Sequence, residues 1–362
     1  MSHTAPHEDH NQSTKKPALS KSGRLGWVDY ARGIAILLVV YRHTLVGLKR
    51  AGVEVLPSLY AVQEFLYNVR MPVFFLLSGV FLAGSLSRYP VKEIFRKKAG
   101  SLLYPYFLWA FILVTIQLFL NKYTNSDRTA ADYWYILTQP RELDHMWYLL
   151  ALFNTTLLYL LVYRLLSRFP VLHLVLAVLL HLASHYIAGY SILSDVFYHY
   201  IFLVSGSLFY TRIVNMERLT TRKLLSCFLL VLPVFILGQL YWLRTTGPDY
   251  TTGSVGQLVP YLIIIWVACF VYYLASRILH VLKAAHWLSV VGKYSLYIYI
   301  LHLLVIAFVR IVFLQVFRVH EVLIILPVSL LLGIVIPVLF YRLTQKWNMY
   351  YVFSLIKPQK KS

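Results

Sequence analysis

The chain has 362 residues, of which 59% are hydrophobic, 16% aromatic and 13% charged, and its mean hydropathy is +0.65. A soluble domain carries about twice that share of charged residues, so the composition excludes an ordinary soluble protein and indicates a multi-pass membrane protein. The formal net charge is +20, but no patch of interleaved basic and aromatic residues lies on a polar domain, so we do not expect nucleic acid as a partner.

The first segment, residues 1–26, is polar and lacks the apolar core of a signal peptide. We expect a disordered cytoplasmic tail. Its stretch "HTAPHEDH" offers possible metal ligands, but a flexible polar tail accounts for it better. Cys227 and Cys269 lie in apolar runs, which argues against a disulfide framework or a metal site. We therefore predict a membrane domain over 27–346, a basic cytoplasmic tail over 347–362, and no bound metal.

Apolar segments of about 20 residues, the length of a membrane-spanning helix, recur nearly to the end of the chain. They predict an all-α integral membrane protein, a polytopic bundle of about ten transmembrane helices. The second and ninth spans are long enough to tilt or kink, and Pro72 is the expected kink site of the second. The expected spans are 27–48, 58–87, 99–121, 146–166, 171–188, 194–213, 223–243, 257–280, 288–316 and 322–345.

The lysines and arginines predict the orientation. With the N-terminus inside, the inner segments hold most of the 34 basic residues, including "RYPVKEIFRKK", "RIVNMERLTTRK" and "KPQKKS". By the positive-inside rule, both termini are then cytoplasmic. The basic residues that fall within or at the edges of spans need another explanation, because intramembrane charge usually faces a cavity or a partner. They are Arg32, Arg42, Arg70, Lys293 and Arg310.

The first span reads "WVDYARGIAILLVVYRHTLVG". At 100° per residue, Asp29, Arg32, Ile36 and His43 lie close to one stripe, which should face the bundle interior. Asp29 and Arg32 can pair one turn apart. Arg42 points elsewhere, and we expect it to snorkel to the outer interface. A lone intramembrane histidine is more often a packing residue, but a histidine that shares a stripe with an Asp–Arg pair favours a functional role.

Several segments resemble the membrane acyltransferase-3 family, and they follow one another in the family's order. The resemblance covers most of residues 24–345, and the start is most similar to the fucose 4-O-acetylase-like branch, a group of carbohydrate O-acetyltransferases. The segments are "DYARGIAILLVVYRH" (29–43), "NVRMPVFFLLSG" (68–79), "RKKAGSLLYPYFLW" (96–109), "HMWYLLALF" (145–153) and "GKYSLYIYILH" (292–302).

The resemblance implies transfer of an acyl group, usually acetyl from acetyl-CoA, to a hydroxyl of an envelope or lipid-linked carbohydrate in the bacterial cytoplasmic membrane. A hydroxyl needs a base, and histidine has a suitable pKa, so we predict His43 as general base. Asp29 is about 20 Å away along the helix, so a group from another helix must complete the site. His302 and His145 lie in family-like segments and are the candidates, although each could equally be a packed polar residue.

The donor carries phosphates and comes from the cytoplasm. Asp29 and Arg32 lie at the inner end of the first span, and Arg96, Lys97 and Lys98 lie in the next inner loop, so we predict these residues as the acetyl-CoA site. For Lys97 and Lys98, the positive-inside rule alone is an alternative explanation. Arg70 is predicted to line the channel along which the thioester reaches His43, or to stabilise charge on its oxygen.

For the acceptor we predict contacts with Trp147, Tyr148 and His145. The chain ends shortly after the last span, so we expect the outer loops 121–145 and 244–256 to supply any recognition of sugars, since their aromatic residues suit stacking on sugar rings. Aromatic residues at a membrane interface are an alternative explanation. Two rival functions remain at this point, a transporter or flippase of a glycan precursor and a non-catalytic assembly subunit. The acceptor, the acyl group and the oligomeric state stay open.

Overall fold

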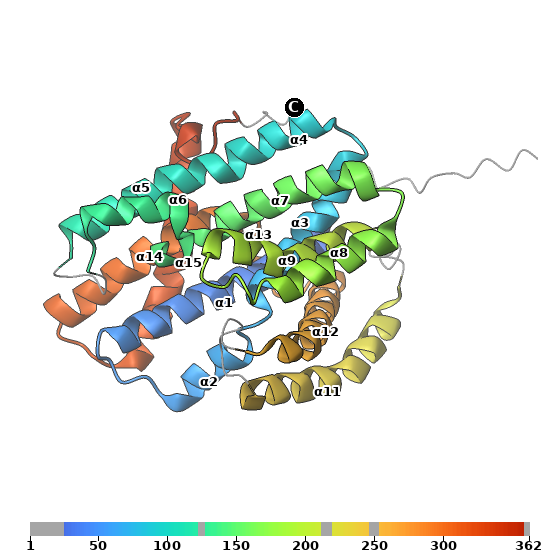
Figure 1. Ribbon diagram of the computed structural model, residues 1–362. Helices are drawn as coiled ribbons and strands as arrows, with labels where there is room; N and C mark the ends of the chain where they lie inside the picture. The colour runs from blue at the N-terminus through green and yellow to red at the C-terminus, as the bar shows by residue number, and fades with distance from the viewer. Residues whose placement is uncertain (1–24, 122–126, 211–218, 246–252, 358–362) are drawn as a thin grey trace, which may run out of the picture.

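The structure is a computed structural model, and it describes residues 25–121, 127–210, 219–245 and 253–357. These residues form helices joined by short loops, without a β-strand among them (Figure 1), which confirms the predicted all-α class. Most of the predicted N-terminal tail, 1–24, lies outside the described residues. The longer helices are α1 (Gly26–Arg50), α2 (Pro57–Phe65), α3 (Arg70–Leu86), α5 (Tyr104–Phe119), α7 (Trp147–Leu166), α8 (Pro170–Ala183), α9 (Ser191–Leu208), α11 (Thr221–Thr245), α12 (Val255–Val281), α14 (Ser295–Ile311) and α15 (Val322–Lys346).

Shorter helical pieces connect them. They are α4 (Val91–Lys98), the π-helical turns η1 (Ala99–Leu103) and η5 (Val312–Val316), the 3₁₀ turns η2 (Ala130–Trp134), η3 (Pro140–Leu143) and η6 (Tyr350–Val352), and the short helices α6 (Tyr135–Thr138) and α13 (His286–Lys293).

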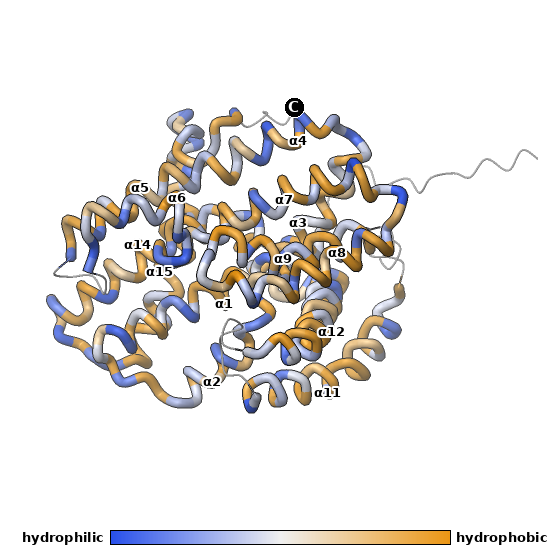
Figure 2. Tube along the Cα trace, viewed as in Figure 1, coloured by the Kyte–Doolittle hydropathy of each residue, from blue (hydrophilic) through white to orange (hydrophobic). Residues whose placement is uncertain are grey.

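Eight segments of the described chain are long and apolar enough to cross a membrane, and they identify a multi-pass helical membrane protein. They are Gly26–Arg50, Pro57–Leu86, Val91–Phe119, Trp147–Leu166, Thr221–Thr245, Val255–Val281, Ser295–Val316 and Val322–Lys346. Helix α11 is mostly apolar (Figure 2), and its side chains Leu229, Leu230 and Leu237 are exposed.

The predicted spans 171–188 and 194–213 correspond to α8 and α9, which are not among these eight segments. Helix α8 has 14 residues, about 21 Å of helix, whereas the hydrocarbon core is about 30 Å thick. Helix α9 carries buried Asp195 and His199 and packs against α3, α7 and α8. A helix enclosed in this way can hold polar groups that lipid would exclude.

Both long predicted spans are interrupted. The second is split into α2 and α3 by a turn at residues 66–69, and the ninth into α13 and α14 at Tyr294. The prediction that Pro72 kinks the second span is wrong. Pro72 is the third residue of α3, where a helix has no internal acceptor for the backbone N–H, so proline fits there without a kink.

Helix α1 lies inside the bundle, where it contacts α3, α12, α13, α14 and α15 (Figure 1). Two glycines allow its closest contact. A Cβ built on Gly33 would lie 2.1 Å from the carbonyl oxygen of Leu288, and one on Gly292 would lie 1.7 Å from that of Asp29. Small residues let two helix backbones approach in this way. The α1–α13 contact therefore requires glycine on both helices, and it fixes the face that α1 turns inward.

The first residues of the predicted C-terminal tail are packed rather than free. After α15 the chain folds back, Phe353 is 2% exposed and stacks on Trp109, and the Leu355 N–H donates to the Gly100 carbonyl at 3.2 Å. The last described residues thus lie beside η1, the turn that follows the basic segment 96–98 (Figure 1). This arrangement puts two segments that the charge pattern predicts as cytoplasmic at one end of the bundle.

Candidate active site

The charged stripe of the first span faces the interior. Asp29 is 5% exposed and Ile36 is fully buried, while Arg32 and His43 are half-buried. The Arg32 guanidinium lies over the ring of Phe81, 4.9 Å from its centre. His43 lines two cavities. The stripe therefore runs from a cation near the predicted inner end of α1 to an accessible imidazole in the predicted outer half.

Three histidines that are far apart in the sequence meet at this imidazole. The ring of His43 lies 5.2 Å from that of His302 and 6.2 Å from that of His145, and the last two rings are 4.9 Å apart, measured between centres. His302 comes from the middle of α14 and His145 from the turn before α7. The structure thus brings together the three histidines that the sequence analysis singled out. In the part of the chain that the structure describes, no group of three or more His, Cys, Asp or Glu has metal-binding geometry.

Backbone contacts indicate which ring nitrogens carry the protons. His302 Nδ1 lies 3.0 Å from the Ile298 carbonyl oxygen and 2.8 Å from that of Tyr299, so Nδ1 donates. His145 Nε2 donates to the Ile300 carbonyl at 3.2 Å. The opposite nitrogens, His302 Nε2 and His145 Nδ1, are buried and have no hydrogen-bond partner among the described residues. Two lone pairs next to His43 are thus available to accept a proton or a hydrogen bond.

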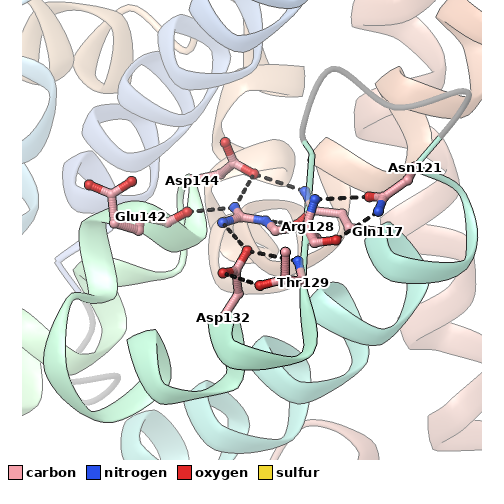
Figure 3. A network of polar contacts seen from close by, with 7 residues as sticks. All are labelled: Gln117, Asn121, Arg128, Thr129, Asp132, Glu142 and Asp144. Carbon is pink, nitrogen blue, oxygen red and sulfur yellow. Dashed lines mark hydrogen bonds and ion pairs between the residues drawn. The ribbon is translucent and has the colours of Figure 1, made fainter.

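The loop that carries His145 is held by a polar network (Figure 3). The Arg128 guanidinium donates to Gln117 Oε1 at 2.9 Å and to the Glu142 carbonyl at 2.5 Å, and it lies 3.5 Å from an Asp132 carboxylate oxygen. Asp144, the neighbour of His145, accepts from Gln117 at 3.0 Å and lies 3.8 Å from Arg128. The Tyr299 O–H donates to the His145 carbonyl and ties the end of this loop to α14. These contacts fix the position of the third histidine.

A cavity of about 380 Å³ opens in front of His43 and His145. Its described lining contains four arginines and one aspartate, together with polar and aromatic side chains. The charged members are Arg42, Arg50, Arg70, Arg141 and Asp144. Because Asp144 already contacts Gln117 and Arg128, the cavity has an excess of positive charge, and we name it the cationic cavity.

The prediction that Arg42 snorkels to the outer interface is wrong. Its guanidinium donates to Gln63 Oε1 at 2.8 Å, lies 4.5 Å from the centre of the Tyr67 ring, and lines the cationic cavity. Arg42 points inward because α2, which carries Gln63, folds over this face of α1. The helical wheel of α1 alone does not show this neighbour. Arg70 lies on the same Tyr67 ring at 4.9 Å, is 4% exposed, and also lines the cavity; its place on the path of the thioester stays a prediction.

The predicted donor residues divide into two groups. Arg32 and Lys98 are both half-buried and interact electrostatically, so they form one group. Lys97 instead pairs with Glu93 at 2.7 Å, and Arg96 is exposed. A smaller cavity of about 120 Å³ lies on this side, lined by Phe81 and Arg88 among others.

The predicted acceptor residues also differ in position. Trp147 lines the cationic cavity, whereas Tyr148 is 6% exposed and packs against Phe75 and Tyr299. Sequence reasoning missed Arg141, which binds the buried Asp195 carboxylate with two nitrogens and lies 4.9 Å from the centre of the Trp147 ring. Little in the sequence indicates this role, because an arginine in a predicted outer loop is common and the sequence does not show that the loop folds inward.

The fold and this site define a membrane protein with a histidine cluster at the meeting point of internal cavities. The family profile described as an acyltransferase domain matches residues 25–342. The chain therefore belongs to the acyltransferase-3 family and is a membrane acyltransferase. No curated protein and no solved structure matches the chain significantly.

Proposed function

We propose that this protein transfers an acetyl group from cytoplasmic acetyl-CoA to a hydroxyl of an envelope carbohydrate in a bacterial cytoplasmic membrane, with His43 as general base. One observation carries the proposal. The His43 ring is accessible from the cationic cavity and has His302 and His145 beside it, each with an unpartnered buried nitrogen. A hydroxyl is a poor nucleophile until a base removes its proton, and a positioned histidine supplies that function.

The proposed transfer exchanges the carbon–sulfur bond of the thioester for a carbon–oxygen bond to the acceptor. A His43 ring nitrogen takes the hydroxyl proton, the acceptor oxygen forms a bond to the thioester carbonyl carbon, and the carbon–sulfur bond breaks. The departing CoA thiolate then takes the proton from the imidazolium, which returns His43 to the neutral form. The unpartnered His302 Nε2 is a hydrogen-bond acceptor beside the His43 ring, and a bond to it from the second His43 nitrogen, formed on substrate binding, would select the tautomer that faces the acceptor.

Arg70 suits the developing negative charge on the thioester oxygen. It donates from Nε to the Tyr67 carbonyl and from Nη1 to the Leu38 carbonyl, both at 3.4 Å. These contacts hold the guanidinium in place and leave further N–H groups for the cavity. A fixed cation in a water-poor site stabilises an oxyanion strongly.

At the predicted inner end, Arg32 and Lys98 are the best candidates to hold the CoA phosphates, because both are half-buried cations that interact electrostatically and phosphate is favoured between two cations. Trp147 in the cationic cavity suits stacking on a sugar ring. The donor would therefore reach His43 from the cytoplasm and the acceptor from the opposite side.

The test uses purified protein with acetyl-CoA labelled in the acetyl group. An acyltransferase releases CoA and moves the label to an extracted envelope glycan fraction, and it needs no sealed compartment. If labelled glycan crosses the wall of sealed proteoliposomes while acetyl-CoA stays intact, the protein is a transporter and the proposal fails.

A further inference from the structure

A second cavity, of about 290 Å³, lies on the other side of His43. We name it the apolar groove. Its walls are hydrocarbon side chains of α5 and α14, among them Leu113, Ile116, Leu303 and Ala307. The apolar groove shares His43, Val46, Arg50 and Asp144 with the cationic cavity. The two cavities therefore meet at the proposed base.

The apolar groove lies on the lipid-facing side of the bundle. Phe308 lines it and is 66% exposed, and on α5 Phe111 and Phe119 are 56% and 85% exposed. Helix α14 packs against α1 and α15, so its face toward α5 is free to form a wall of the groove. In a membrane, exposed aromatic and aliphatic side chains at this depth contact lipid tails.

One end of the apolar groove carries cations. Arg310 donates to the Gly47 carbonyl at 3.2 Å, one helical turn before Arg50, and Arg50, Arg310 and the acid Asp144 all line the groove. The acid of the lining, Asp144, also contacts Gln117 and Arg128. Among the described residues, no carboxylate forms an ion pair with Arg50 or Arg310. Two neighbouring arginines at the end of an apolar groove are complementary to a phosphate joined to a hydrocarbon chain.

We propose that the apolar groove holds the hydrocarbon chain of the acceptor, a phosphate-bearing lipid of the outer leaflet whose saccharide carries the hydroxyl to be acylated. This inference rests on the proposed function. The chain lies between α5 and α14, the phosphate lies at Arg50 and Arg310, and the saccharide passes His43 into the cationic cavity. The orientation is that of an outer-leaflet lipid, because the charge pattern predicts the end of α1 that carries Arg50 to be external.

The phosphate, rather than the chain, supplies most of the affinity. A lipid tail in the groove leaves one apolar environment for another, so its transfer gains little. A phosphate that meets two guanidinium groups forms charge-assisted hydrogen bonds, which are about twice as strong as neutral ones. Removal of the phosphate should therefore weaken binding by about tenfold or more.

The test is photolabelling of the purified full chain in phosphatidylcholine nanodiscs. The probe is an isoprenyl phosphate with a diazirine in its chain, and the matched control is the isoprenyl alcohol with the same diazirine. We expect the phosphate to label peptides from α5 and α14 at about tenfold lower concentration than the alcohol. Ala307→Trp, which fills the groove, and Arg310→Gln should both abolish this preference. Leu230→Trp on the lipid face of α11 and Arg318→Gln in the loop after η5 should keep it.

Equal labelling by the two probes would identify ordinary boundary lipid and overturn the inference. Displacement of the probe by long-chain acyl-CoA, but not by unlabelled isoprenyl phosphate, would assign the groove to the acyl chain of the donor and also overturn it. Consumption of acetyl-CoA is measured on the same nanodiscs. Phosphate-dependent labelling without that consumption would reject the proposed acetyl transfer while the lipid site stands.

Discussion

Arg128→Ala should release the loop that carries His145. The side chain is 9% exposed and connects three parts of the chain, the end of α5 through Gln117, the η2 turn through Asp132, and the segment before α7 through Glu142 and Asp144 (Figure 3). Its removal leaves two carboxylates without their shared cation. The loop should then leave its folded position more often, and His145 with it.

The structure gives the size of the effect. Two of the Arg128 contacts are hydrogen bonds within 3 Å, and a hydrogen bond from a charged group contributes about 1.5 to 3 kcal/mol. Asp132 and Asp144 are 12% and 26% exposed, so water partly replaces the lost cation and the lower end of the range applies. The sum is about 3 kcal/mol, which is roughly a 100-fold increase in local opening.

Hydrogen exchange measured by mass spectrometry reports this opening directly. Peptides from residues 127–146 should exchange faster in Arg128→Ala, peptides from α1 and α14 should not, and acyl transfer should fall. Arg168→Ala, an exposed arginine between α7 and α8, is the control and should behave like wild type. Adding Asp144→Asn to Arg128→Ala should cost less than the sum of the single effects, because it removes one stranded charge. Unchanged exchange in 127–146 would refute the reasoning.

Three further predictions concern helix packing, the donor site and topology. Gly292→Val should prevent the close α1–α13 contact and sharply lower the yield of folded protein in size-exclusion chromatography. Gly256→Val is the control and should fold, because an added Cβ there meets nothing within 4 Å; equal yields of the two variants would contradict this packing account. Arg32→Ala should weaken acetyl-CoA binding about tenfold or more in calorimetry of folded protein. Lys92→Ala, which removes an exposed cation on α4, should leave it near wild type, and the reverse pattern would move the donor site. A reporter fused after Lys98 should read as cytoplasmic, and an external reading would overturn the orientation.

The sequence predicted most of what depends on local pattern. Length and hydropathy predicted the eight segments of the described chain that are long and apolar enough to cross a membrane, and two more that are not among them. Helical periodicity put Asp29 and Ile36 on the buried face of α1. The local sequence pattern gave wrong predictions where contacts with other helices determine the structure. Helix α9 carries Asp195 and His199 because other helices enclose it, and Pro72 lies in the first turn of a helix because the span is interrupted at residues 66–69. Neither fact is visible within a window of one helix.

The candidate site was likewise predicted where motifs identify residues and not where packing places them. The order of the motifs selected His43, His145 and His302. In the structure their ring centres lie 4.9 to 6.2 Å apart. The direction of Arg42 was predicted wrongly, because a helical wheel shows which residues share a face and not which helix covers that face. Arg141 was missed since its position depends on a loop fold that a single sequence does not specify. Long-range packing therefore determines the charge of the cavity.

The central claim is that His43 is the base, and His43→Gln tests it most directly. Glutamine keeps polarity and approximate volume but cannot accept and return a proton near neutral pH. In single-turnover assays on folded protein with labelled acetyl-CoA, between about pH 6 and 8, acyl transfer should fall by roughly 100-fold while acetyl-CoA binding stays near wild type. Transfer at a near-normal rate across that pH range, in a variant that binds the donor normally, would contradict the account and move the search for the base to His302 or His145.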